Sequence, residues 1–202
     1  MHGTSPEYTH AHLSLERTPP TLSPRLLALI PSAVAINLAI GFIVNQLGLP
    51  LYLDTIGTVL TAALAGPLAG VITGLVSQAV RSLSEGYIWL PFGLVQVCIA
   101  LLAAIVARRR GFRSVGTSLA WGVLVGLAAG ALSAAISYFV FKGVTATGVT
   151  AVTLVLTRLG LTLPQAVTIA SVGTDVIDKA IVFVLVGIAL RALPLRVAAR
   201  FG

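Results

Sequence analysis

Apolar residues run almost without interruption along most of this chain, in blocks separated by short polar breaks. About 20 consecutive apolar residues cross a hydrocarbon core of about 30 Å, and continuous apolar runs favour helices over the alternating strands of a membrane barrel. We therefore predict an all-α membrane protein, a six-transmembrane-helix bundle. Its expected segments are Leu26–Gln46, Thr55–Ala65, Leu68–Leu83, Ile88–Val106, Ser118–Phe141 and Val172–Leu193.

The second and third segments are short for full spans. Gly66-Pro67 between them is a turn signal, so the two segments are expected to form a hairpin packed inside the bundle. Residues 142–173 are too polar, and too often broken by Gly and Pro, to form a comfortable span. Within this stretch only Val149–Leu159 is expected to be helical, as a short surface helix.

The composition agrees with a membrane location. Hydrophobic residues make up 57% of the 202 positions, charged residues only 9%, and the mean hydropathy is +1.01, whereas a soluble domain is about a quarter charged. The net charge of +7 does not indicate a nucleic-acid partner, because the basic residues flank apolar segments and form no stripe with interleaved aromatics.

The basic residues instead predict the topology. Six spans with an internal N-terminus place nine Lys or Arg residues on one side and three on the other, with Lys179 set aside as intramembrane, so both termini are expected to be cytoplasmic. Residues 1–24, which hold all three histidines, are expected to be a disordered cytoplasmic tail. Residues 25–202 then form one six-helix membrane domain.

Polar side chains are confined to one half of this predicted bundle. A channel or a proton relay would carry polar groups through the whole depth of the membrane, and the inner half here is nearly free of them. The pattern predicts a cup that is open to the outside and closed below by packed small residues. The outer group is Asp54, Thr55, Gln78, Arg81, Glu85, Trp89, Tyr138, Asp175, Asp178 and Lys179.

The last segment holds the densest charge cluster, "TDVIDKAIVF" at residues 174–183. Asp175 and Lys179 are four residues apart and can pair on one helical face, whereas Asp178 is expected to point elsewhere. Because a charge inside a membrane is costly, the pair is either a salt bridge between helices or a contact to a ligand. Both interpretations stay open, for Asp178 as well.

Asp54 precedes the second segment and is well placed to be its N-cap. The alternative is that residues 47–54 form a lid with Tyr52 or Asp54 facing a ligand. The two interpretations are compatible, because a cap would fix the loop.

Five further polar or aromatic positions have a structural and a functional interpretation. Arg81 with Glu85 is either a solvated ion pair at the membrane edge or an anion clamp, and Trp89 fits an interface aromatic. Asn37 and Gln96 lie at mid-depth and fit hydrogen bonds between helices better than ligand contacts.

Small residues recur in the first segment and in the hairpin. Ala35-x-x-x-Ala39 and Gly66-x-x-x-Gly70-x-x-x-Gly74 allow helices to approach closely, within the bundle or toward a second chain. No Ser/His/Asp set, membrane-embedded histidine, cysteine pair or Walker sequence is present, so we predict no enzymatic activity, no metal and no cofactor. If ATP drives this protein, another subunit must bind it.

The chain resembles the substrate-binding S components of energy-coupling factor (ECF) vitamin transporters over nearly all residues after 24. The resemblance lies in "LPLYLDTIGTVLTAALAGPLAGVITGLVSQAV" (49–80), the small-residue first helix, the six-segment layout and "TDVIDKA" (174–180). It implies a multi-pass subunit of a bacterial or archaeal cell membrane that captures a water-soluble vitamin or vitamin precursor. A transmembrane coupling (T) subunit and two cytoplasmic ATPases would complete the transporter.

The resemblance also implies roles for particular residues. Ala35 and Ala39 match the pattern that meets the coupling subunit, and the loop at about Gly48–Asp54 matches the one that covers the pocket. The expected substrate-binding residues are Tyr52, Asp54, Gln96, Tyr138, Asp175, Asp178 and Lys179. A membrane sensory or scaffold domain, in which the polar cluster is purely structural, is the alternative from another functional class.

Overall fold

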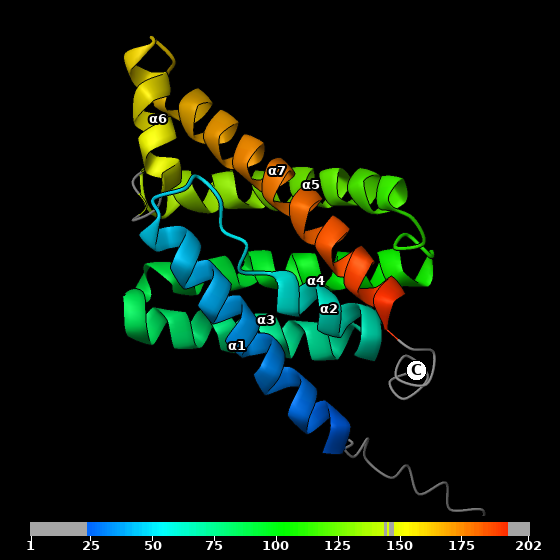
Figure 1. Ribbon diagram of the computed structural model, residues 1–202. Coiled ribbons are helices and arrows are strands. Elements are labelled where there is room, and N and C mark those ends of the chain that lie inside the picture. The colour runs from blue at the N-terminus through cyan, green and yellow to red at the C-terminus, as the bar shows by residue number, and fades with distance from the viewer. Residues whose placement is uncertain (1–23, 144, 146–147, 194–202) are drawn as a thin grey trace, which may run out of the picture.

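The computed structural model describes residues 24–143, 145 and 148–193 (Figure 1). This part of the chain is helical and contains no strand, which confirms the all-α prediction. The predicted tail lies outside the described residues, except for Pro24. The elements are α1 (Pro24–Gln46), α2 (Ile56–Ala65), α3 (Pro67–Glu85), the 3-10 helix η1 (Tyr87–Phe92), α4 (Gly93–Arg108), α5 (Val115–Phe139), α6 (Gly148–Arg158) and α7 (Leu163–Ala192).

Three stretches of the described residues are long and apolar enough to cross a membrane. They are Ala28–Gln46, Tyr87–Arg108 and Val115–Phe139. α7 is longer than any of them but carries two acids and two basic residues, which lower its hydropathy. The helices thus fit a multi-pass membrane protein, while the count of six spans stays a prediction.

The predicted start of the last segment was wrong. α7 begins at Leu163, nine residues before Val172. Gln165 Oε1 accepts hydrogen bonds from the backbone N–H of Thr162 at 3.1 Å and from its hydroxyl at 2.9 Å, which fixes the start of the helix. Pro164 lies in the first turn, where its missing N–H costs nothing, so it starts this helix instead of breaking it.

The fourth segment also differs from the prediction at its beginning. Tyr87–Phe92 is a 3-10 helix that contains Pro91, and the α-helix proper starts at Gly93. The predicted short surface helix is confirmed as α6. The Gly66-Pro67 turn is confirmed too, with Gly66 at φ 89°, a conformation that glycine adopts without strain.

α5 and α7 lie against each other with almost no side chains between their backbones. A Cβ atom on Gly126 would be 2.6 Å from Val176 Cα, and one on Gly130 would be 2.6 Å from Val172 Cα. Gly122 meets the Lys179 carbonyl in the same way, at 2.6 Å. This glycine seam, Gly122, Gly126 and Gly130, was not among the small-residue patterns identified from the sequence.

The predicted close approaches in the hairpin are confirmed at two of their three glycines. A Cβ on Gly70 would lie 2.6 Å from Ala62 Cβ on α2, and one on Gly74 would lie 2.8 Å from Gln96 Cβ on α4. A Cβ on Gly57 of α2 would likewise clash with the Ala33 carbonyl of α1, so helices α1 to α4 pack closely together. The segment between α1 and α2, drawn in cyan, runs between α1 and α7 on its way to α2 (Figure 1).

Candidate functional site

A small pocket lies between the α1–α4 group and the α5/α7 pair. Five of the seven predicted substrate-binding residues line it, together with aliphatic and aromatic side chains, so its wall is part polar and part apolar. The lining residues are Tyr52, Asp54, Thr55, Gln78, Trp89, Phe92, Val95, Gln96, Ile99, Ser133, Asp175 and Lys179.

Lys179 lies between two carboxylates of its own helix. Its Nζ is 2.5 Å from Asp178 Oδ2 and 3.4 Å from Asp175 Oδ1, and all three residues are at most 1% exposed. The predicted pairing of Asp175 with Lys179 is confirmed. The expectation that Asp178 points elsewhere was wrong, because the long lysine side chain reaches its neighbour in sequence as well. A buried ammonium group needs such counter-ions, since its desolvation is costly.

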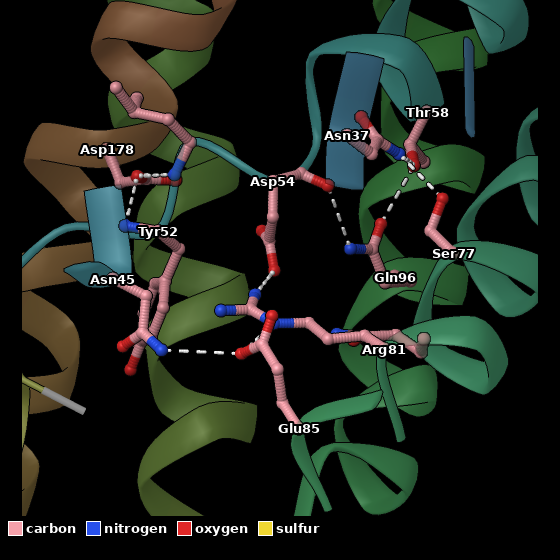
Figure 2. A network of polar contacts seen from close by, with 12 residues as sticks. Asn37, Asn45, Tyr52, Asp54, Thr58, Ser77, Arg81, Glu85, Gln96 and Asp178 are labelled. Atoms are coloured by element: carbon pink, nitrogen blue, oxygen red, sulfur yellow. Dashed lines mark hydrogen bonds and ion pairs between the residues drawn. The ribbon is translucent and has the colours of Figure 1, made fainter. Parts of the chain in front are cut away.

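Asp178 also fixes the segment between α1 and α2. Its Oδ1 accepts hydrogen bonds from the backbone N–H groups of Tyr52 at 2.9 Å and Leu53 at 2.7 Å (Figure 2). Leu53 has φ 48°, in the left-handed region that side chains other than glycine rarely adopt, and the paired bonds hold it there. The Tyr52 ring lies over Lys179, with its centroid 5.8 Å from Nζ. One carboxylate of α7 thus holds both the loop and the lysine.

Asp54 pairs with Arg81 of α3 instead of capping α2. Asp54 Oδ2 is 2.9 Å from Arg81 Nη1, while Thr55 occupies the N-cap position and makes no side-chain capping bond. The N-cap interpretation of Asp54 was therefore wrong. Arg81 Nε also lies 3.0 Å from Glu85 Oε2, and Asn45 of α1 donates to the same oxygen at 3.3 Å (Figure 2).

The Arg81–Glu85 pair is confirmed, but it is not a solvated pair, because the Arg81 side chain is only 4% exposed. Trp89 covers the guanidinium group, with Arg81 Cζ 3.5 Å from the ring centroid. Trp89 is itself 4% exposed, so its interpretation as an interface aromatic was wrong. It lines the pocket instead, and its ring is tilted against that of Phe92.

Asn37 and Gln96 make the hydrogen bonds between helices that the sequence predicts. Asn37 Nδ2 donates to Thr58 Oγ1 at 3.0 Å and to Ser77 Oγ at 3.1 Å, and its Oδ1 accepts from Gly57 N at 2.7 Å. The Thr58 hydroxyl donates onward to Gln96 Oε1 at 2.8 Å (Figure 2). This chain of bonds joins α1, α2, α3 and α4.

Gln96 is in addition a pocket residue. Its Nε2 donates to the Asp54 carbonyl at 3.3 Å, so the amide links the wall of the pocket to the loop before α2. Sequence reasoning did not find its apolar neighbours Phe92, Val95 and Ile99. Their spacing around Gln96 is that of one helical face, and this spacing is the signal that identifies them.

Two predicted substrate-binding residues do not line the pocket. Tyr138 is 36% exposed and packs edge-on against Phe139, with 5.1 Å between the ring centroids. Asp178 lies behind Lys179 and contacts the loop backbone. On α1, Ala35 and Ala39 are exposed.

Comparison with known proteins identifies the family of this chain. The sequence model of the family described as ECF-type riboflavin transporter, S component, matches residues 23–189. No curated protein and no solved structure gives a significant match. The matched range contains every described helix apart from the end of α7, and with it the entire pocket. The chain therefore belongs to the ECF-type riboflavin transporter S component family.

Proposed function

We propose that this protein is the high-affinity substrate-binding membrane subunit of an ECF-type importer, with riboflavin or a related water-soluble vitamin as its cargo. It takes the cargo from outside and passes it inward with a coupling (T) subunit and two cytoplasmic ATPases. In this arrangement the chain spans a bacterial or archaeal cell membrane six times, with both termini in the cytoplasm. The riboflavin assignment takes its support from the family.

The pocket and its covering loop are the observation that carries this proposal. Ligand pockets are mostly apolar, with a few convergent polar groups that fix orientation, and this one combines Trp89, Phe92 and Ile99 with buried acids and a lysine. Tyr52 and Asp54 belong to the loop and line the pocket. Two hydrogen bonds to Asp178 hold this loop in place at the side of the pocket.

The polar groups suit binding better than catalysis. Asp54, Asp175 and Asp178 all have basic partners, and the lining residues include no histidine and no cysteine, so they hold no Ser/His or Cys/His pair. Such a site holds its cargo by contact and releases it unchanged. ATP hydrolysis then belongs to the partner subunits.

The first experiment is to purify the protein in detergent without added vitamins, denature it and identify the released compound by mass spectrometry. We expect a flavin, or another vitamin-like compound, at about one molecule per protein. Riboflavin is then titrated into ligand-depleted protein and followed by quenching of flavin fluorescence. An empty protein that also binds no member of a vitamin panel would contradict the proposal.

The two tryptophans provide a matched pair of variants for this titration. Trp89 lines the pocket, whereas Trp121 of α5 packs beside Gly111 and the apolar core. Replacing a stacking aromatic by alanine costs about 1–3 kcal/mol of binding, so Trp89→Ala is expected to raise the Kd by about tenfold or more. Trp121→Ala is expected to leave the Kd unchanged. Equal effects of the two variants would place the site elsewhere.

A further inference from the structure

Two polar atoms of the pocket have no hydrogen-bond partner. Among the described residues, Thr55 Oγ1 and Asp175 Oδ2 are the buried side-chain oxygen or nitrogen atoms left unpaired. Both residues are 1% exposed, and both line the same pocket. Buried polar atoms are normally paired, so two unpaired atoms in one cavity indicate that a bound molecule completes them.

The unpaired carboxylate oxygen is an acceptor. Lys179 Nζ lies 3.4 Å from the other oxygen of Asp175, Oδ1, so the carboxylate is paired on one oxygen only. Ser133 of α5 is the hydroxyl that faces this carboxyl group, and it lines the pocket too. A ligand group that meets Oδ2 must bring a hydrogen, as N–H or O–H, because an approaching acceptor would be repelled.

The charges around the pocket also disfavour an anionic ligand. Three buried carboxylates, Asp54, Asp175 and Asp178, face two buried cations, Arg81 and Lys179. Both cations are already paired, and Glu85 adds a further acid beside Arg81. Among the described residues around the pocket no cation is left over to neutralise an anionic ligand, and repulsion between like charges is strong where water is excluded.

We propose that the pocket takes a neutral or cationic ring compound that donates an N–H or O–H to Asp175 Oδ2, and that it excludes anionic, phosphorylated forms of the same compound. The ring lies against the apolar face formed by Phe92, Val95 and Ile99, and Thr55 Oγ1 supplies the second polar contact. This inference rests on the proposed function, and it defines the chemical class of the cargo more narrowly.

Riboflavin and riboflavin 5′-phosphate test the inference, because they share one fluorescent ring and differ in a phosphate group. Each is titrated into the full-length protein in detergent, after removal of any bound ligand. We expect riboflavin to bind on the order of 100-fold more tightly than its phosphate, since a site without a partner for a charge rejects it strongly. Asp175→Asn is expected to weaken riboflavin binding by about tenfold or more. It should also reduce the ratio between the Kd of riboflavin 5′-phosphate and the Kd of riboflavin.

Ser137→Ala is the matched control, since Ser137 is a buried serine of α5, one turn after Ser133, that does not line the pocket, and this variant should keep both the affinity and the preference. Equal affinity of the wild-type protein for both flavins would overturn this inference and leave the proposed function intact. Unchanged riboflavin binding in folded Asp175→Asn would overturn the role of Oδ2. If that variant does not fold, the wild-type ratio alone decides. A protein that binds neither flavin would overturn both proposals.

Discussion

Asp54 and Arg81, 27 positions apart in the chain, form a buried ion pair with 2.9 Å between Oδ2 and Nη1. The pair connects the loop before α2 to α3 at the wall of the pocket. Removing one partner of a buried pair leaves the other charge uncompensated, which costs about 3–5 kcal/mol. We therefore expect Arg81→Ala to lower the free energy of unfolding by about this amount, measured by circular dichroism in detergent.

Glu85→Gln is the control for this prediction, because Glu85 contacts the same guanidinium group from a side chain that is 19% exposed. Partly solvated pairs contribute little, so a loss of less than about 1 kcal/mol is expected. The double variant Asp54→Asn/Arg81→Gln should recover part of the stability lost in Arg81→Ala. Losses of equal size in Glu85→Gln and Arg81→Ala would show that burial of the Asp54 pair is not what matters.

The bonds from Tyr52 and Leu53 to Asp178 predict slow hydrogen exchange at two backbone amides of the loop. A bond to a charged acceptor is roughly twice as strong as a neutral one. In ligand-free protein, Asp178→Asn is expected to speed exchange at both amides by about tenfold, because the amide oxygen is a weaker acceptor. Hydrogen exchange followed by mass spectrometry measures the effect.

Asp175→Asn is the comparison here, since it removes the other carboxylate partner of Lys179 without touching the loop. Its exchange rates at residues 52 and 53 should match those of the wild-type protein. Acceleration in both variants would mean that Lys179, and not Asp178, holds the loop.

The Asn37 side chain joins three helices. Its removal leaves the groups that it contacts on Thr58, Ser77 and Gly57 without this hydrogen-bond partner. Each unsatisfied buried group costs about 1–3 kcal/mol, so Asn37→Ala is expected to lower the free energy of unfolding by at least about 2 kcal/mol. Asn45→Ala on the same helix loses one part-buried bond to Glu85 and should cost less than about 1 kcal/mol. Unfolding curves of similar midpoint for the two variants would contradict this ranking.

The glycine seam predicts intolerance of even one methyl group. Gly126→Ala places a Cβ 2.6 Å from the α7 backbone and is expected to cost about 1–3 kcal/mol through the forced separation of the helices. Gly116→Ala, on the same helix with nothing within 4 Å, should be neutral or slightly stabilising. Thermal unfolding of both variants is the measurement, and a stable Gly126→Ala protein would refute the seam.

The exposed positions Ala35 and Ala39 test assembly separately from binding. Ala35→Trp and Ala39→Trp should fold and bind cargo normally, yet lose the coupling subunit when the complex is purified through a tag on an ATPase. Ala120→Trp, at an exposed position of α5, should still copurify. Retention of the complex by all three variants would move the coupling contact away from α1.

The helix positions were largely predictable, because an apolar run in a membrane protein leaves the backbone no alternative to helical hydrogen bonding. The C-terminus of α2 and the N-terminus of α3 follow from the Gly66-Pro67 signal. The start of α7 could not be predicted in the same way, since Gly160 and Pro164 usually indicate breaks. Only the Thr162 and Gln165 bonds show that Pro164 lies in a first turn.

The charged residues of the pocket were predictable, but their partners were not. Costly intramembrane charges such as Asp175 and Lys179 identify themselves by residue type. The partners of Asp54 and Asp178 come from distant segments, Arg81 on α3 and the loop at Tyr52, and no local pattern indicates which acid meets which group. Local rules therefore favoured the N-cap interpretation of Asp54, and tertiary packing overrode it.

The glycine seam restricts how the molecule can move. Two helices whose backbones touch have no layer of side chains to rearrange, so we expect α5 and α7 to move as a single rigid body. Ser133, Asp175 and Lys179 then keep their mutual geometry whatever the state of the pocket. If the pocket opens for a ligand, we expect the movement on the opposite wall, where the loop meets Asp178 and where η1 presents Trp89. The α5/α7 pair would then be the fixed wall of the pocket, and the loop before α2 its mobile wall.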